Sequence, residues 1–344
     1  MKFALVGNGY WGSKLLRNLV ALVGGERVVV AEPSDARRAA AVASHPAIGT
    51  SRSLDEVLDD PDVGAVVLAT PVTTHAELTE AALTAGRDVL VEKPLTASVA
   101  TSRRLVAVAE AHGRVLMVGH TFLFSPRVQW IASYLHGGGA DQIHYLTSSR
   151  LNLGIHRSDV NVIWDLAPHD FSVVFHLLGE FPVTIATSTR AIVHPGHPDT
   201  AFMNLTFPSG VIAEVAVSWL APRKVRTLTL VADSGMLVYD DVDPEEPVKI
   251  HDRGVVIDDS ADFGLHQLTY RYGDTRSPHI PVEEPLARQL AHFESAVRRR
   301  TTPISDGRFG LQVVAALEAA DRSWRDGGTP AVVDAGIDEL AVRE

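Results

Sequence analysis

The sequence predicts an α/β protein in two parts: a parallel sheet wrapped by helices, then an α+β region built on a large, mostly antiparallel open sheet. Residues 1–120 alternate short apolar runs with amphipathic stretches, a pattern typical of βαβ units. After about residue 140 the segments lengthen and alternate with period 2, as in 211–217, which indicates antiparallel strands with one covered face. A length of 344 residues accommodates two domains, which we place at 1–120 and 121–344.

The first part is expected to contain five strands and five helices in alternation. Its most apolar strands, such as 65–69, fit burial on both faces of a sheet. Strands are expected at 2–6, 27–31, 65–69, 88–91 and 115–118, and helices at 12–23, 36–44, 54–58, 75–85 and 99–112.

The second part opens after a Gly137-Gly138-Gly139 turn signal with a helix expected at 165–178. Strands are expected at 183–193, 201–207, 211–219, 225–232 and 236–239. The polar stretch 240–283 is expected to form loops with one short strand at 255–257. Helices at 286–299 and 308–324 close the chain and can pack back on the first domain.

Composition excludes several classes of protein. Apolar residues are 46% and charged residues 21%, which is ordinary for a soluble enzyme. A net charge of −11 argues against nucleic acid or an anionic membrane as partner. Without cysteine there is no thiolate chemistry, and the histidines at 169, 176, 194 and 197 form no dense ligand cluster, so no metal is expected. We find no signal peptide and no apolar run of about 20 residues, and expect a cytoplasmic protein.

A glycine motif follows the first strand directly and opens the first helix. It reads Gly7-Asn8-Gly9-Tyr10-Trp11-Gly12, the G-x-G-x-x-G of a Rossmann dinucleotide-binding domain, whose backbone approaches a pyrophosphate at a helix N-terminus. Glu32 ends the second strand, where an acidic side chain accepts from ribose hydroxyls and favours NAD over NADP. Two alternatives stay open: a tight turn without cofactor, or a 2′-phosphate held by Ser34, Arg37 and Arg38.

Three further loops follow strands at the same edge of the parallel sheet, where ligands bind in such folds. One carries Thr70-Pro71 and His75, another Glu92-Lys93-Pro94, and the third His120. We expect Thr70, Pro71, His75, Glu92, Lys93 and His120 to contact the cofactor. Lysine is scarce, with five against 26 arginines, so Lys93 at this edge is a candidate catalytic group. The alternative is a solvated lysine at a turn.

Taken together, these motifs resemble the Gfo/Idh/MocA family of oxidoreductases, and the resemblance covers essentially the whole chain. Glu-Lys-Pro after the strand expected at 88–91 is its most specific mark, and the large antiparallel sheet agrees with it. The resemblance implies NAD(P)-dependent oxidation or reduction of a sugar or cyclitol carbon, with Lys93 matching an active-site lysine. It also implies that Asp165 and His169 match the family's Asp-x-x-x-His pattern.

Asp165 and His169 are four residues apart, so they share a face of the helix that is expected to start near Asp165. That start is inferred from Pro168, which a helix tolerates in its first turn. Asp165 could therefore be the N-cap, His169 a hydrogen-bonded core histidine, and Asp170 the partner that orients His169. We assign His169 as general base, Asp165 as its orienting group or a substrate ligand, and Lys93 as stabiliser of the developing alkoxide. Lys93 could relay the proton itself if burial made it neutral.

Polar residues before the helix are candidate substrate ligands. We expect substrate to contact Lys93, Arg150, Asn152, Asn161, Asp165 and His169, with Arg127, His156 and Arg157 nearby. Arginine could bind a phosphate, although in this arginine-rich chain surface arginine is the simpler explanation. The segment Trp-Asp-Leu-Ala-Pro-His-Asp resembles that of family members that act on nucleotide sugars or aminosugar precursors. Free inositol or an aminocyclitol glycoside is the alternative substrate.

Two other functions remain open: an NAD-retaining glycosidase of the same family, and a non-catalytic dinucleotide sensor. Lys93, Asp165 and His169 argue against the sensor, which needs only the glycine loop. The open face of the second sheet predicts a homodimer or homotetramer.

Overall fold

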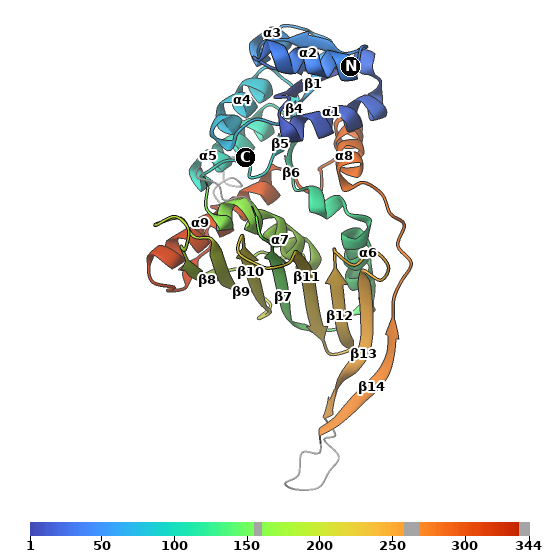
Figure 1. Ribbon diagram of the computed structural model, residues 1–344, viewed down its shortest axis with the longest axis vertical. Coiled ribbons are helices and arrows are strands. Elements are labelled where there is room, and N and C mark those ends of the chain that lie inside the picture. The colour runs from blue at the N-terminus through green and yellow to red at the C-terminus, as the bar shows by residue number, and fades with distance from the viewer. Residues whose placement is uncertain (155–159, 258–267, 337–344) are drawn as a thin grey trace. The chain divides into compact units, whose positions relative to one another are not determined.

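The computed structural model describes residues 1–154, 160–257 and 268–336, and the chain divides into two compact units (Figure 1). Unit 1 comprises Met1–Ser125, Glu283–Glu318 and Asp334–Glu344. Unit 2 comprises Pro126–Val282 and Ala319–Val333. Each unit is built on a sheet of its own.

Unit 1 contains a six-stranded, wholly parallel sheet in the order β3-β2-β1-β4-β5-β6. Its strands are β1 (Lys2–Val6), β2 (Val28–Ala31), β3 (Gly49–Ser51), β4 (Val63–Leu68), β5 (Asp88–Glu92) and β6 (Leu116–Gly119). Its helices are α1 (Tyr10–Val23), α2 (Asp35–Ser44), α3 (Leu54–Leu58), α4 (Val72–Thr84), α5 (Val99–Ala111) and α8 (Pro285–Arg299), with short turns η1 (Gly25–Arg27) and η2 (Thr121–Phe124). This arrangement confirms the expected Rossmann-type parallel sheet.

Local sequence explains where these helices start. Ser34, Ser53 and Ser98 each accept the backbone N–H three residues ahead, which caps α2, α3 and α5. The central strands are buried along their lengths, as their continuous apolar sequences require. Helix α8 returns to this unit from the far end of the sequence and contacts α1, and the ring of Phe293 meets that of Phe3 edge-on at 6.4 Å.

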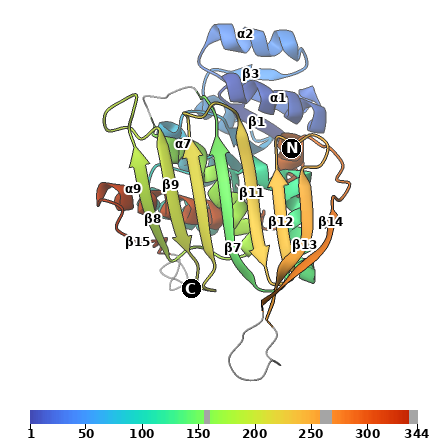
Figure 2. The same ribbon diagram turned by 60° about the horizontal axis from the view of Figure 1, so that its bottom comes forward.

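Unit 2 contains a nine-stranded sheet in the order β14-β13-β12-β11-β7-β10-β9-β8-β15, antiparallel except for the β7–β10 pair (Figure 2). The strands are β7 (Ile143–Leu151), β8 (Thr184–Arg190), β9 (Thr200–Thr206), β10 (Ile212–Ser218), β11 (Val225–Ala232), β12 (Gly235–Asp240), β13 (Val248–Ile257), β14 (Leu268–Arg276) and β15 (Ala331–Val332). The helices are α6 (Pro126–Tyr134) and α7 (Val162–Leu178), with a π-turn η3 (Leu135–Gly139). Helix α9 (Gly307–Arg325) is shared between the units. The large, mostly antiparallel sheet is confirmed.

Alternation in β9 shows how the sequence selects one face of this sheet. Ala201, Met203 and Leu205 are buried, whereas the residues between them face away from the core. Helix α7 contacts β7, β9 and β10, and Figure 2 shows it on one face of the sheet with the other face open. The period-2 pattern therefore indicates a sheet that is covered by a helix on one face.

The start of α7 differs from the sequence prediction. The helix begins at Val162, and Asn161 is its N-cap, with its side chain accepting from the Trp164 N–H at 3.1 Å. Asp165 is thus in the first turn and is not the cap, and Pro168 lies inside the helix, where it has no N–H to donate to the Trp164 carbonyl. Burial of Val162 and Ile163 stabilises the additional turn at the start of the helix. This gain outweighs the preference of Pro168 for the first turn, from which we had placed the start near Asp165.

The stretch expected to be mostly loops contains two long strands instead. Strands β13 and β14 pair antiparallel and form the end of the sheet farthest from β15. Val255, Tyr270 and Tyr272 are exposed on them, so large apolar and aromatic side chains of these strands do not mark a buried face as they do in β9.

Among the described residues, no helix is long and apolar enough to cross a membrane.

Candidate active site

The glycine motif of unit 1 lies between β1 and α1 and has the backbone geometry that a bound pyrophosphate needs. Gly7 has φ +89°, and a Cβ there would lie 2.7 Å from the Ala69 carbonyl oxygen. A Cβ on Gly12 would lie 2.2 Å from the Gly7 oxygen, whereas a Cβ on Gly9 meets nothing within 4 Å. Gly9 is the N-cap of α1 and its first turn has no side-chain cap. The loop therefore fits a dinucleotide: two glycines allow tight packing, and the third leaves space beside backbone N–H donors.

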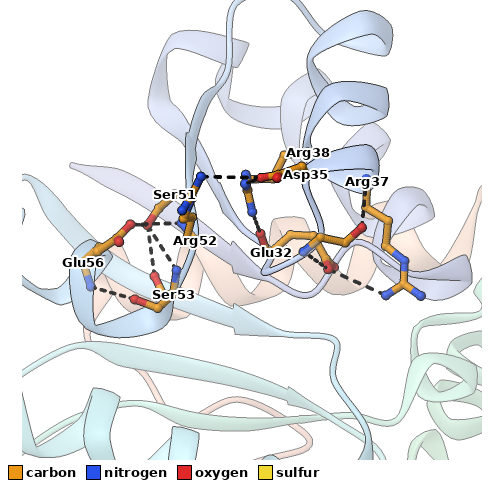
Figure 3. Close-up of polar contacts among 9 residues, drawn as sticks. Glu32, Asp35, Arg37, Arg38, Ser51, Arg52, Ser53 and Glu56 are labelled. Atoms are coloured by element: carbon orange, nitrogen blue, oxygen red, sulfur yellow. Dashed lines mark hydrogen bonds and ion pairs between the residues drawn. The ribbon is translucent and has the colours of Figure 1, made fainter.

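The carboxylate of Glu32 is held beside this loop at the end of β2 (Figure 3). Its Oε2 accepts from the Asn8 N–H at 2.8 Å, and its Oε1 accepts from the Ser34 N–H at 3.1 Å. The Arg37 guanidinium lies 3.7 Å from Glu32 Oε1. The Glu32 side chain is buried, with 3% of its surface exposed. An anionic group at this place suits ribose hydroxyls and disfavours a 2′-phosphate.

The arginines near Glu32 are already engaged with oxygen partners. Arg38 pairs with Asp35 and donates to the Glu32 carbonyl, and Arg52 lies 3.8 Å from Asp35 (Figure 3). Ser51 and the Arg52 N–H donate to Glu56, which fixes the adjoining loop. These pairs oppose the alternative in which Arg37 and Arg38 hold an extra phosphate.

His75 braces two of the loops at the carboxyl edge of the sheet. Its Nδ1 lies 3.0 Å from the Pro94 carbonyl oxygen, and its Nε2 lies 3.0 Å from that of Thr70. The side chain is buried, and burial lowers the pKa of His75, so the ring is neutral and only one nitrogen donates at a time. Through these contacts His75 joins the Thr70-Pro71 turn to the Lys93-Pro94 turn, and the contact of these residues with the cofactor stays a prediction.

His120 follows β6 and is also buried. Its ring meets Phe309 edge-on at 5.7 Å, and burial, followed by the charge of Lys93, lowers the pKa of His120 to about 3. Neither ring nitrogen has a hydrogen-bond partner among the described residues. His120 is therefore a neutral imidazole near Lys93.

In unit 2, the first two turns of α7 carry Asp165 and His169. The Trp219 indole N–H donates to Asp165 Oδ2 at 3.2 Å, and Trp219 itself is buried. A Cβ on Gly154 would lie 2.9 Å from the Trp219 ring, so this glycine makes room for the indole. Trp219 was absent from our sequence-based candidates because no motif marks a tryptophan that orients a distant carboxylate.

Both carboxylate oxygens of Asp170 accept hydrogen bonds from strand β7, and its role as the partner that orients His169 stays a prediction. Ser148 Oγ donates to Oδ1 at 2.8 Å and Arg150 Nε to Oδ2 at 2.6 Å. Arg150, expected to bind substrate, is thus a buried ion-pair partner that ties α7 to β7. Its role toward substrate stays a prediction.

Among the other candidate substrate ligands, Asn161 and Arg127 make side-chain hydrogen bonds, and Asn152 is held through its backbone. Asn161 caps α7 and donates to Asp321 Oδ1 at 3.2 Å. The Asn152 N–H donates to the Ser218 carbonyl at 3.1 Å, and Arg127 donates to the Asp241 carbonyl at 3.2 Å. His156 and Arg157 lie outside the described residues. Within the described ranges, no group of three or more His, Asp or Glu side chains could hold a metal ion.

Comparison with known proteins identifies the family. Residues 1–120 match the model of an oxidoreductase family with an NAD-binding Rossmann fold, and residues 99–238 match the GFO/IDH/MocA C-terminal domain. The UDP-N-acetylglucosamine 3-dehydrogenase of Acidithiobacillus ferrooxidans is 30% identical over 232 residues, which cover 67% of this chain and 71% of that enzyme. The chain belongs to the Gfo/Idh/MocA family. It is an NAD-dependent dehydrogenase, as the sequence predicted.

One further relative and one solved structure extend the family match over nearly the full length. The scyllo-inositol 2-dehydrogenase (NAD(+)) of Bacillus subtilis is 25% identical over 343 residues, which cover 95% of each chain. A solved structure of the A. ferrooxidans UDP-N-acetylglucosamine 3-dehydrogenase matches with a TM-score of 0.76 and 25% identity, covering 94% of this chain and 97% of that chain. The Gfo/Idh/MocA fold therefore includes both units of the chain.

Proposed function

We propose that this Gfo/Idh/MocA protein oxidises a ring hydroxyl of a sugar, nucleotide sugar, aminosugar or cyclitol to a ketone, or catalyses the reverse reaction. The observation that carries the proposal is the glycine loop, whose geometry fits a dinucleotide, in a chain whose relatives are named as dehydrogenases of a nucleotide sugar and of an inositol. The paired state of Glu32 and its arginine neighbours supports NAD as the cofactor.

In this proposal, different side chains accept the hydroxyl proton and stabilise the charge that develops on the oxygen. The glycine loop and Glu32 would hold NAD, which would supply the acceptor for the hydride of the carbinol carbon. His169 accepts the hydroxyl proton, and Asp165, held by the Trp219 indole, orients the imidazole or a substrate hydroxyl. The Lys93 ammonium stabilises negative charge that develops on the oxygen. His120 and His75 stay neutral and so do not compete with Lys93 as cations.

We further propose that the protein is a homodimer or homotetramer that associates through the open face of the unit 2 sheet. Tyr145, Phe202 and Ile212 are 45%, 49% and 52% exposed, and the strand register places Tyr145 directly beside Ile212. These side chains alternate with the buried positions of β7, β9 and β10, so they lie on the face away from α7 (Figure 2). Apolar groups on an open sheet face are typical of an interface between subunits.

A substrate panel tests the proposed reaction. The purified protein is mixed with NAD and, separately, UDP-N-acetylglucosamine, myo- and scyllo-inositol, and an aminocyclitol glycoside, and NADH absorbance and products are followed. Stoichiometric NADH with a ketone product supports the proposal. Cleavage of the glycoside without net NADH would identify the glycosidase instead, and calorimetric NAD binding without any turnover would favour the sensor.

A further inference from the structure

The glycine loop and the Lys93 loop are joined by a tryptophan–carboxylate contact that the dinucleotide motif does not require. The Trp11 indole Nε1 donates to Glu92 Oε1 at 2.5 Å, and the Lys93 backbone N–H donates to Glu92 Oε2 at 3.3 Å. Trp11 occupies a variable position of G-x-G-x-x-G, and Glu92 is the last residue of β5. Both oxygens of one carboxylate are therefore held, one by each loop.

The backbone of the neighbouring strand is shaped to receive this carboxylate. Gly119 lies opposite Glu92 in the β5–β6 register. A Cβ on Gly119 would lie 3.1 Å from Glu92 Oε1 and 3.3 Å from Glu92 Cα. A larger residue would push the carboxylate from its place between Trp11 and the Lys93 N–H, so the sequence provides the space as well as both donors.

We propose that Trp11 and Glu92 are positioning residues: the Trp11 indole fixes the Glu92 carboxylate, and this carboxylate fixes the backbone of Lys93. The inference rests on the proposed function of Lys93. It adds that the loop expected to receive the cofactor phosphates also sets the position of the lysine. The indole N–H then acts on turnover through Glu92, and the indole makes no contact of its own with the substrate.

The charge state of Glu92 gives the contact a measurable signature. Burial raises the pKa of Glu92 to about 7, although the Trp11 hydrogen bond and the Lys93 charge each act to lower it. The other groups around it are Lys14, which lies 5.5 Å over the Trp11 ring, and His75 and His120, whose lowered pKa values keep them neutral there. An indole hydrogen bond strengthens when its acceptor ionises, so the Trp11 indole proton should move downfield as Glu92 loses its proton.

The test uses the protein without NAD or substrate. The chain has five tryptophans, so the Trp11 indole signal in the ¹⁵N-labelled protein is assigned by its loss in Trp11→Phe. Titrated from about pH 5 to about pH 9, this signal should shift once, with a midpoint near the Glu92 pKa of about 7, and the shift should vanish in Glu92→Gln. An indole that does not titrate, or that titrates unchanged in Glu92→Gln, would overturn the proposal. This readout is independent of whether a substrate is turned over.

Kinetics separate positioning from packing. Trp11→Phe keeps an aromatic side chain, although a smaller one, and removes the N–H donor. We expect kcat to fall about tenfold while the NAD dissociation constant changes less than about threefold. The matched control is Trp324→Phe, which removes another indole–carboxylate bond, to Asp321 at 2.9 Å, and should change neither quantity. If Trp11→Phe weakens NAD binding as much as it lowers kcat, Trp11 merely packs the loop. Should Trp11→Phe fail to fold, the Trp11 indole signal is assigned instead as the one whose titration disappears in Glu92→Gln. Gly119→Ala must then shift that signal, and an unchanged signal counts against the proposal.

Discussion

Replacing Gly9 by alanine tests whether the glycine loop of this protein receives the cofactor. The added methyl group meets no protein atom within 4 Å, and the Gly9 backbone, at φ −77°, is open to any residue. The loss of a glycine N-cap costs about 1 kcal/mol and is offset by the smaller entropy of the unfolded chain, roughly 0.4–1 kcal/mol. The free energy of unfolding should therefore change by less than about 1 kcal/mol.

The effect on NAD should be far larger, because the methyl group occupies the space beside the α1 N-terminus where a phosphate would approach. Loss of one or two hydrogen bonds to a charged group, at about 1.5–3 kcal/mol each, corresponds to an affinity about 10²-fold weaker. Gly12→Ala is the contrasting variant. Its Cβ would lie 2.2 Å from the Gly7 oxygen, so it should destabilise the fold itself by about 3 kcal/mol.

Calorimetric titration with NAD and urea denaturation of each variant measure the two effects separately. The reasoning is refuted if Gly9→Ala binds NAD as tightly as the unaltered protein. That result would make the loop a tight turn without a phosphate site.

Three other predictions follow from single contacts in unit 2. Arg150→Met leaves the buried Asp170 charge without its partner and should lower the free energy of unfolding, measured by urea denaturation, by about 3 kcal/mol. An unchanged urea midpoint would show that the ion pair does not stabilise the contact between α7 and β7. Trp219→Phe removes the donor to Asp165 and should lower kcat about tenfold with an unchanged circular dichroism spectrum; full activity would exclude this positioning. Phe202→Lys places a charge on the open sheet face and should yield smaller species in sedimentation velocity; an unaltered distribution would place the interface elsewhere.

The sequence was most informative where local chemistry determines the backbone. The glycine loop, five of the six parallel strands and the loops that carry Thr70, Lys93 and His120 were predictable, because strand ends of a parallel sheet share one edge. The short edge strand β3 was not among the expected strands. Period-2 alternation likewise identified strands β8 to β12 of unit 2, whereas β7, which also has buried positions, was not among the expected strands.

Features set by contacts between distant segments were not predictable. The start of α7 depends on burial of Val162 and Ile163, which outweighs the signal from Pro168. The engagement of Arg150 with Asp170, and of Trp219 with Asp165, depends on how α7 crosses the sheet, which no local pattern encodes. Strands β13 and β14 were missed because charged and polar residues and glycine make up much of their sequences, which is also typical of loops.

The assignment of Lys93 as the group that stabilises charge in the proposed reaction is tested most directly by Lys93→Ala. On the substrate identified by the panel, kcat should fall at least about 10²-fold, while the NAD dissociation constant measured by calorimetry changes only a few-fold. A variant that turns over at close to the original rate, or whose NAD affinity falls as far as its kcat, would contradict the account.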